Sequence, residues 1–224
     1  WTNQPSDRMH QTIIPFATYA PWLTDQEFLD VYEAIKGNTL VDLFRCYELW
    51  TLARQSVKAE GDVLEVGVWR GGSGTLLAEA IRREDGKRIY LADTFTGVVK
   101  AGENDPKYTG GEHSDTSEAL VRDLLDSRAL TNYELLVGTF PDSTGQRVTG
   151  KLCLVHCDVD VYQSAKDIFD WCVPRLSIGS LFIFDDYGFS GCEGVAKLCE
   201  ELANRDDFIF VHNLNGHGIL IKVH

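Results

Sequence analysis

The chain has 224 residues, with 34 acidic against 21 basic side chains, and a formal charge of −13. This length suits one α/β domain with a short extension, and a hydrophobic content of 44% is enough for a packed core. An acidic chain is a poor partner for nucleic acid or an anionic membrane, and no apolar run approaches the ~20 residues of a membrane span. The six cysteines lack C-x-x-C spacing and favour reduced core positions. We therefore expect a cytoplasmic protein without nucleic-acid or membrane partners.

The first 60 residues lack the strand–helix alternation of the rest and predict an N-terminal arm and helices that cap a site. Residues 1–23 hold three prolines and favour an extended or irregular arm. Thr24 with Glu27 forms a capping-box pattern for a helix to about Lys36, and apolar residues at helical spacing predict a second helix over 40–58. These helices carry aromatic side chains that face either a partner subunit in a homo-oligomer or the domain itself, namely Phe28, Tyr32 and Trp50.

Residues 61–224 alternate short apolar runs with helical stretches, which predicts right-handed β-α-β units and a parallel sheet. Expected strands are 63–66, 89–92, 133–137, 152–157, 181–184, 208–211 and 219–223, and expected helices are 73–83, 115–128 (with Asp115 as a cap), 162–172 and 192–204. Asn215-Gly216 between the last two strands is a hairpin signal. The fold class expected is α/β, a Rossmann-like domain with a seven-stranded, mostly parallel sheet and a C-terminal antiparallel hairpin.

The long segment 94–114 follows the second expected strand and carries four glycines with Glu103, Asp105 and His113. A loop of this length in a compact domain is usually a lid, a binding loop or disordered. Its position after the carboxyl end of a strand, where open α/β sheets bind ligands, favours a lid or a substrate-binding loop.

A glycine-rich turn links the first expected strand to the next helix, in the run from Val63 to Ser73. Glu65-x-Gly67-x-x-x-Gly71 lets the backbone approach a ligand, and the helix start offers free N–H groups to a carboxylate. Glu65 at the strand end suits a cationic ammonium group better than a pyrophosphate. The G-x-G-x-x-G pattern of dinucleotide-binding proteins is absent, which disfavours a nicotinamide-dependent oxidoreductase.

Further candidate ligand-binding residues follow the second and third expected strands. Asp93 ends the second strand, where a carboxylate can accept hydrogen bonds from both ribose hydroxyls. Gly138, Thr139 and Phe140 follow the third strand and would lie beside the same crevice, with Phe140 placed either on an adenine ring or in the core.

Four acids end two neighbouring strands: Asp158 and Asp160 after the fourth, Asp185 and Asp186 after the fifth. Like charges gathered at one rim raise one another's pKa unless a cation intervenes. Mg²⁺ prefers oxygen ligands and tolerates partial protein ligation. The pattern therefore predicts a divalent metal site.

These motifs together resemble the macrocin O-methyltransferase (TylF-like) family of class I S-adenosylmethionine-dependent methyltransferases. The resemblance rests on Gly67-Val68-Trp69-Arg70-Gly71-Gly72, Asp93-Thr94-Phe95-Thr96-Gly97, Asp158-x-Asp160-x-Tyr162 and Asp185-Asp186-Tyr187-Gly188. It implies an O-methyltransferase that uses S-adenosylmethionine and Mg²⁺ on a hydroxyl of a sugar, vicinal diol or phenol, in the tailoring of an antibiotic or other natural product. The acceptor itself is not specified, because residues 1–60 and the lid match the family poorly.

The same resemblance implies roles for individual residues. Asp158, Asp185 and Asp186 would hold the metal, and Asp160 would be the general base. The cofactor would contact Glu65, Gly67, Val68, Gly71, Ser73, Asp93, Thr94, Phe95, Gly138, Thr139, Phe140 and Asp158, with Ser73 on the methionine carboxylate.

Alternatives remain open at this level. His113 on the lid and His156 beside Asp158 are other proton acceptors by residue type, although His156 is expected on the core face of its strand. The paired aspartates also resemble haloacid-dehalogenase-type phosphatases, but that reading needs the D-x-D on the first strand. A non-catalytic cofactor-binding module is the third possibility, disfavoured because it would have no need of four clustered acids.

Overall fold

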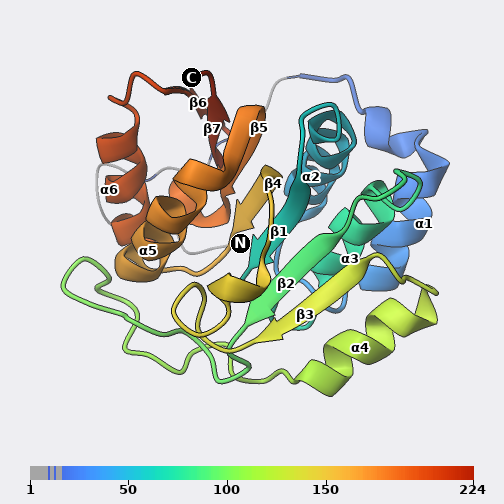
Figure 1. Cartoon of the computed structure of the whole chain (residues 1–224), viewed down its shortest axis with the longest axis horizontal. Helices are drawn as coiled ribbons and strands as arrows, with labels where there is room; N and C mark the ends of the chain where they lie inside the picture. The colour runs from blue at the N-terminus through green and yellow to red at the C-terminus, as the bar shows by residue number, and fades with distance from the viewer. Residues whose placement is uncertain (1–9, 11–12, 14–16) are drawn as a thin grey trace.

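The computed structural model of the chain describes residues 10, 13 and 17–224, so most of the arm expected over 1–23 lies outside the described residues. Seven strands form one sheet in the order β3-β2-β1-β4-β5-β7-β6 (Figure 1). They are β1 Asp62–Val66, β2 Ile89–Asp93, β3 Tyr133–Val137, β4 Leu152–Cys157, β5 Leu176–Phe184, β6 Phe208–His212 and β7 Gly218–Lys222. Pairs among β1 to β5 are parallel, and β7 runs antiparallel to both β5 and β6. The expected fold class, with its C-terminal hairpin, is confirmed.

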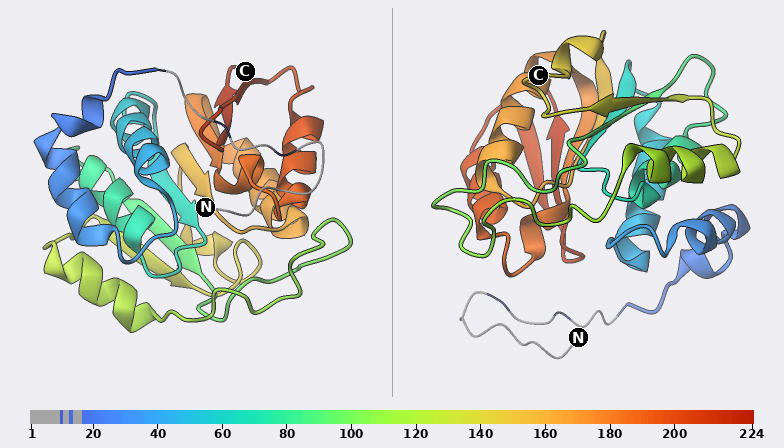
Figure 2. Two further views of the ribbon diagram at one scale, coloured as in Figure 1. Left: turned by 180° about the vertical axis from the view of Figure 1, so that it is seen from behind. Right: turned by 90° about the horizontal axis from the view of Figure 1, so that it is seen from below.

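Helices cover both faces of the sheet (Figures 1 and 2). One face carries α1 Gln26–Ile35, α2 Leu43–Ser56, α3 Gly72–Ala80 and α4 Glu118–Ser127, and the other carries α5 Tyr162–Cys172 and α6 Glu193–Leu202. Short 3₁₀ turns occupy Pro21–Leu23, Gly145–Arg147, Val173–Arg175 and Asp185–Gly188. No helix in the described part of the chain is long and apolar enough to cross a membrane.

The N-terminal helices pack on the domain and extend its core. Phe28 and Trp50 are almost completely buried in the same apolar cluster as Leu76 and Leu77 of α3. Of the two partners considered for these aromatic side chains, the domain itself is therefore the observed one for Phe28 and Trp50. All six cysteines are buried and free, as expected for reduced core residues.

Helix starts are where the sequence interpretation needs correction. The α1 cap is Asp25, whose Oδ1 accepts from the Phe28 amide, whereas Thr24 bonds back to the Pro21 carbonyl, so the Thr24–Glu27 capping box is wrong. Helix α2 begins at Leu43 under an Asp42 cap. Helix α4 is capped by Ser117, and Asp115 instead pairs with Arg70. For α1 and α4, a different polar side chain with the right backbone geometry caps the helix in place of the one chosen from the sequence.

Smaller differences concern element ends. Helices α3 and α6 are shorter than expected, and β5 starts five residues earlier, at Leu176, beyond a register irregularity in its pairing with β4.

The strand order reverses between β1 and β4, which places a crevice at their carboxyl ends.

Candidate active site

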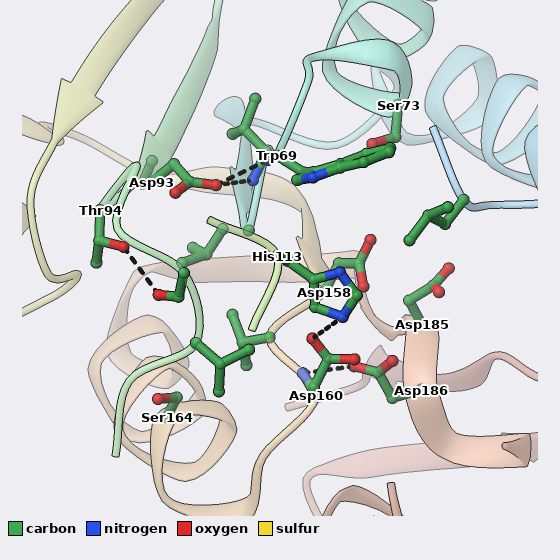
Figure 3. Close-up of a pocket in the computed structure, with 18 of the residues that line it drawn as sticks. Trp69, Ser73, Asp93, Thr94, His113, Asp158, Asp160, Ser164, Asp185 and Asp186 are labelled. Atoms are coloured by element: carbon green, nitrogen blue, oxygen red, sulfur yellow. Dashed lines mark hydrogen bonds and ion pairs between the residues drawn. The ribbon is translucent and has the colours of Figure 1, made fainter. Parts of the chain in front are cut away.

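A cavity of about 440 Å³ opens at the carboxyl ends of β1, β2, β4 and β5. Its walls include twelve of the residues singled out from the sequence, several of which are shown in Figure 3: Gly67, Val68, Ser73, Asp93, Thr94, Gly138, Thr139, Phe140, Asp158, Asp160, Asp185 and Asp186. The parallel strands thus bring together side chains that lie more than 100 positions apart in the chain.

The turn after β1 is shaped by close backbone packing. Gly67 adopts a φ of 91°, and a Cβ there would lie 1.6 Å from the Asp158 carbonyl oxygen, so only glycine fits. Helix α3 then begins at Gly72, whose amide donates to the Asn38 carbonyl at 2.9 Å. This bond fixes the α1–α2 connection over the cavity, which Asn38, Thr39, Leu40 and Val41 help to line.

Asp93 organises the β2 side of the cavity. Its Oδ2 accepts from the amides of Val68 and Trp69 at 2.7 and 2.8 Å, and its Oδ1 accepts from the Phe95 amide at 2.7 Å. The carboxylate therefore holds two loops in place, and with three of its roughly four lone-pair sites used, Oδ1 keeps one for a ligand hydroxyl.

Three of the residues expected to contact a cofactor do not line the cavity: Glu65, Gly71 and Phe95. Glu65 is fully buried and its Oε1 lies 2.9 Å from His156 Nδ1. Gly71 backs onto Val121, and Phe95 packs against the apolar cluster under α1–α4. The strand pleat turns Glu65 into the interior, which corrects its expected place beside an ammonium group.

The acids that end β4 and β5 do converge. Asp158, Asp185 and Asp186 each offer a carboxylate oxygen, and these atoms all lie within 4.8 Å of one another. Burial and the neighbouring carboxylates raise the pKa of Asp158 and of Asp186 well above the ordinary value. A divalent cation with oxygen preference would relieve this repulsion, so the donor set fits Mg²⁺.

Asp185 has a different environment from the other two acids. Burial alone would raise its pKa, but Arg45, His156 and His217 outweigh burial and hold the pKa well below the ordinary value. Arg45 from α2 forms a buried ion pair with Asp185 Oδ2 and also packs on the Phe189 ring. These three side chains therefore favour the ionised form of Asp185.

Asp160 sits in strained backbone geometry with a φ of 65°. Its amide donates to Asp186 Oδ2 at 2.8 Å, and its Oδ1 accepts from the Tyr108 hydroxyl at 2.6 Å. Its Oδ2 lies 3.9 Å from His113 Nε2. Burial raises the pKa of Asp160, and the Tyr108 hydrogen bond opposes that rise. The side chain is thus aimed into the cavity as a carboxylate with increased basicity.

The segment 94–114 contributes both walls and anchors. Asp105 is buried, and its Oδ1 accepts from the Tyr162 amide at the start of α5, at 2.8 Å. Lys100 pairs with Asp142 and Asp167. Tyr108 and His113 line the cavity. This placement over the cavity is the one expected for a ligand-site loop; whether it opens and closes stays a prediction.

The two histidines considered as proton acceptors lie in different places relative to the cavity. His156 is completely buried in β4 and does not line the cavity, as expected for the core face of its strand. His113 does line it, beside Asp160.

Sequence reasoning missed several cavity residues, chiefly Arg45, Trp69, Tyr108, Phe189, Ser190 and Cys192. Arg45 lies inside a helical pattern, where an arginine is ordinarily solvent-exposed, and no local signal marks its pairing with an acid 140 positions away. Trp69 lies within the recognised glycine-rich motif and Tyr108 within the 94–114 loop, so membership of those segments was the available signal.

Comparisons with known proteins identify relatives and structural neighbours of this chain. Relatives include the 8-demethyl-8-(2,3-dimethoxy-alpha-L-rhamnosyl)-tetracenomycin-C 4'-O-methyltransferase of Streptomyces olivaceus, 32% identical over 59% of this chain and 55% of its own length. Another is the demethyldecarbamoylnovobiocin O-methyltransferase of Streptomyces niveus, 31% identical over 57% of this chain and 53% of its own length. The chain therefore spans about half the length of these curated relatives.

Solved structures share the fold. The O-methyltransferase NovP matches with a TM-score of 0.70 at 23% identity, covering 84% of this chain and 83% of NovP. An O-methyltransferase from Bacillus cereus in complex with SAH matches with a TM-score of 0.58 at 18% identity, covering 89% and 92%. A family model described as macrocin-O-methyltransferase (TylF) matches residues 36–208, most of the chain. The chain belongs to the macrocin-O-methyltransferase (TylF) family.

Proposed function

We propose that this protein is an S-adenosylmethionine- and Mg²⁺-dependent O-methyltransferase that acts on a hydroxyl group of a small natural product. The observation that carries this proposal is the convergence of Asp158, Asp185 and Asp186 with Asp160 at the rim of one cavity. Family membership and the named activities of the relatives support the reaction type. A sugar hydroxyl is the favoured acceptor, because the first relative's name places its 4'-O-methylation on a rhamnosyl derivative.

The residues that line the cavity fall into two groups. Gly67, Ser73, Asp93 and Thr139 line the part beside β1 to β3, where S-adenosylmethionine would bind, with its ribose on Asp93 and its carboxylate near Ser73 at the start of α3. The acid group lies beside β4 and β5, where Mg²⁺ and the acceptor would bind. When bound, the two supply an electrophilic methyl group and a Lewis acid that lowers the pKa of the acceptor hydroxyl.

The protein's own contribution is to orient the acceptor and remove its proton. Asp160, with a raised pKa and fixed by Tyr108, is placed to accept that proton. Holding the acceptor oxygen in line with the methyl group would supply much of the remaining acceleration.

A phosphatase of the haloacid-dehalogenase type is not favoured. In the sheet observed, the D-x-D follows β4, with β1, β2 and β3 before it in the chain, and the family match is to methyltransferases.

The proposed function is tested by measuring methyl transfer from labelled S-adenosylmethionine to a panel of glycosylated acceptors, with and without excess chelator. Full activity in excess chelator would remove the metal from the proposal, and phosphate release from an aryl phosphate would favour the phosphatase.

A further inference from the structure

A second group of potential metal ligands lies on the interior side of Asp185. Its donor atoms come from His156 on β4, Asp185 after β5 and His217 immediately before β7, and all lie within 4.8 Å of one another. His156 and His217 are completely buried, and neither lines the cavity described above. The group is therefore distinct in position from the acids that face the cavity, although it shares Asp185 with them.

The distances within this group suit ligands that share one ion. His217 Nε2 is hydrogen-bonded to Asp185 Oδ1 at 3.0 Å, a bond that a shared ion would replace, and His156 Nε2 lies 3.5 Å from the same oxygen. Two donors bound at about 2.0–2.2 Å to one ion, with angles between 90° and 110°, are separated by about 3.0–3.5 Å. The imidazole rings stand at 79° to each other with centroids 6.1 Å apart, so their Nε2 atoms converge without stacking.

His156 supplies an independent sign that a ligand is missing. Its Nε2 is a buried polar atom without a hydrogen-bond partner among the described residues, and it lies 3.5 Å from Asp185 Oδ1. A buried polar atom left without a partner costs roughly 1–3 kcal/mol, so such atoms are rare unless an ion or a water completes them.

The outer partners of both histidines follow the pattern of metal-binding sites. His156 Nδ1 lies 2.9 Å from Glu65 Oε1, and His217 Nδ1 lies 2.5 Å from Glu48 Oε2. A carboxylate on Nδ1 favours the tautomer that carries its hydrogen there and leaves the Nε2 lone pair free for a metal. This arrangement also gives a role to Glu65, which does not reach the cavity.

The charge balance fits a divalent ion. Glu48, Glu65 and Asp185 contribute three negative charges, and Arg45 on the other oxygen of Asp185 contributes one positive charge. Metal ligation requires both imidazoles to be neutral, and two negative charges then remain in a buried region for a divalent ion to balance.

We propose that His156, Asp185 and His217 form a buried binding site for a divalent transition-metal ion, held by Glu65 and Glu48 from outside. Two imidazoles and one carboxylate favour ions such as Zn²⁺, Fe²⁺ or Co²⁺ over Mg²⁺. The ion ties β4, β7 and the end of β5 together and fixes Asp185 from behind. This site does not depend on the proposed methyl transfer.

Co²⁺ is the probe for this site, because its visible d–d spectrum reports on nitrogen ligation. The full chain is unfolded, stripped with chelator and refolded with Co²⁺, since the buried histidines are reached most easily during folding. After gel filtration, bound cobalt is measured by mass spectrometry and absorbance. We expect one tightly held Co²⁺ per wild-type chain, complete loss in His217→Ala, and 10–100-fold weaker binding in Glu48→Gln.

Two control variants locate the ion. His212→Ala removes an exposed histidine of β6 and should leave Co²⁺ bound. Asp158→Asn weakens the cavity-facing acid group and should also leave the spectrum unchanged. If His217→Ala does not fold, the Glu48→Gln variant decides. The proposal is overturned if refolded wild type retains no Co²⁺, or if the signal survives in His217→Ala and Glu48→Gln but is lost in Asp158→Asn.

Discussion

The amide of Asp160 donates a hydrogen bond to Asp186 Oδ2 at 2.8 Å, joining the segment after β4 to the turn after β5. The unusual φ of 65° at Asp160 directs its amide toward Asp186 and its side chain into the cavity. The proposed base and the proposed metal ligand are thereby placed in a fixed relation by the backbone, before any substrate binds.

The metal role proposed for Asp186 predicts a specific loss of activity. Asp186→Asn should reduce kcat at least ~10²-fold, because a Lewis acid contributes several kcal/mol to transfer at an activated hydroxyl. The affinity for S-adenosylhomocysteine should change less than threefold, because the residues proposed to hold it lie beside β1 to β3. Calorimetry and turnover measurements check this prediction. Glu118→Gln on exposed α4 is a matched control, and wild-type turnover in Asp186→Asn would contradict the assignment.

The two candidate bases can be separated by isosteric variants. Asp160→Asn should lower kcat by ~10²–10⁴-fold, the usual contribution of a general base. His113→Asn should lower it less than tenfold, because His113 lies 3.9 Å from Asp160 and is more exposed than that residue. Steady-state rates at saturating cofactor and metal decide between them. A larger loss in His113→Asn would transfer the role to the histidine.

The hydrogen bond from Tyr108 predicts a shift in the pH profile. Asp160 acts in its ionised form, so kcat/KM should rise with pH through the pKa of Asp160, which burial raises. The Tyr108 hydrogen bond lowers that pKa, so Tyr108→Phe should move the acidic limb of the profile to higher pH. Profiles are compared at the same saturating Mg²⁺. An acidic limb that stays in place, or moves to lower pH, would show that the bond does not tune Asp160.

Mg²⁺ should stabilise the protein more at higher pH. The raised pKa values of Asp158 and Asp186 mean that protons compete with the ion, and this competition weakens as the pH rises. The increase in Tm on adding Mg²⁺ should therefore be larger near pH 8 than near pH 5.5, and it should be absent in Asp158→Asn. Equal increases at both pH values would argue against these carboxylates as ligands.

The buried pair of Arg45 and Asp185 predicts a large effect on stability. Arg45→Gln removes the buried cation that contacts Asp185 Oδ2 and should lower the free energy of unfolding at pH 7 by about 3–5 kcal/mol. The pKa of Asp185 is lowered in the fold, so this stabilisation is present above the unfolded pKa, about 3.9, and is lost as the pH falls toward the folded pKa. Urea denaturation measures it. Arg122→Gln removes an exposed pair with Glu118 and should cost under ~1 kcal/mol; a similar loss in both variants would be inconsistent with this account.

Strand periodicity, glycine turns and strand-end acids were sufficient to predict the sheet and most of the cavity. These signals are local, and parallel topology then dictates that carboxyl ends meet, which is why Asp93, Asp158 and Asp186 could be placed together. The predicted capping residues of α1 and α4 were wrong because several polar residues precede each helix, and backbone geometry selects among them.

Side-chain contacts between residues far apart in the chain could not be predicted from the sequence. Nothing near Arg45 in the sequence marks Asp185 as its partner. Glu65 begins the same glycine-rich motif whether its side chain faces a cofactor or contacts His156. The direction of a side chain at a strand end depends on the pleat and on the neighbouring strand, so the interior network of Glu65, His156 and His217 became visible only in three dimensions.

The most direct test is a crystal structure with S-adenosylhomocysteine and Mn²⁺ in place of Mg²⁺, read by anomalous scattering at the manganese edge. The account predicts a Mn²⁺ peak bounded by Asp158, Asp185 and Asp186, with the ribose of the bound ligand on Asp93. Absence of that peak at saturating Mn²⁺, or a ligand bound away from Asp93, would contradict it.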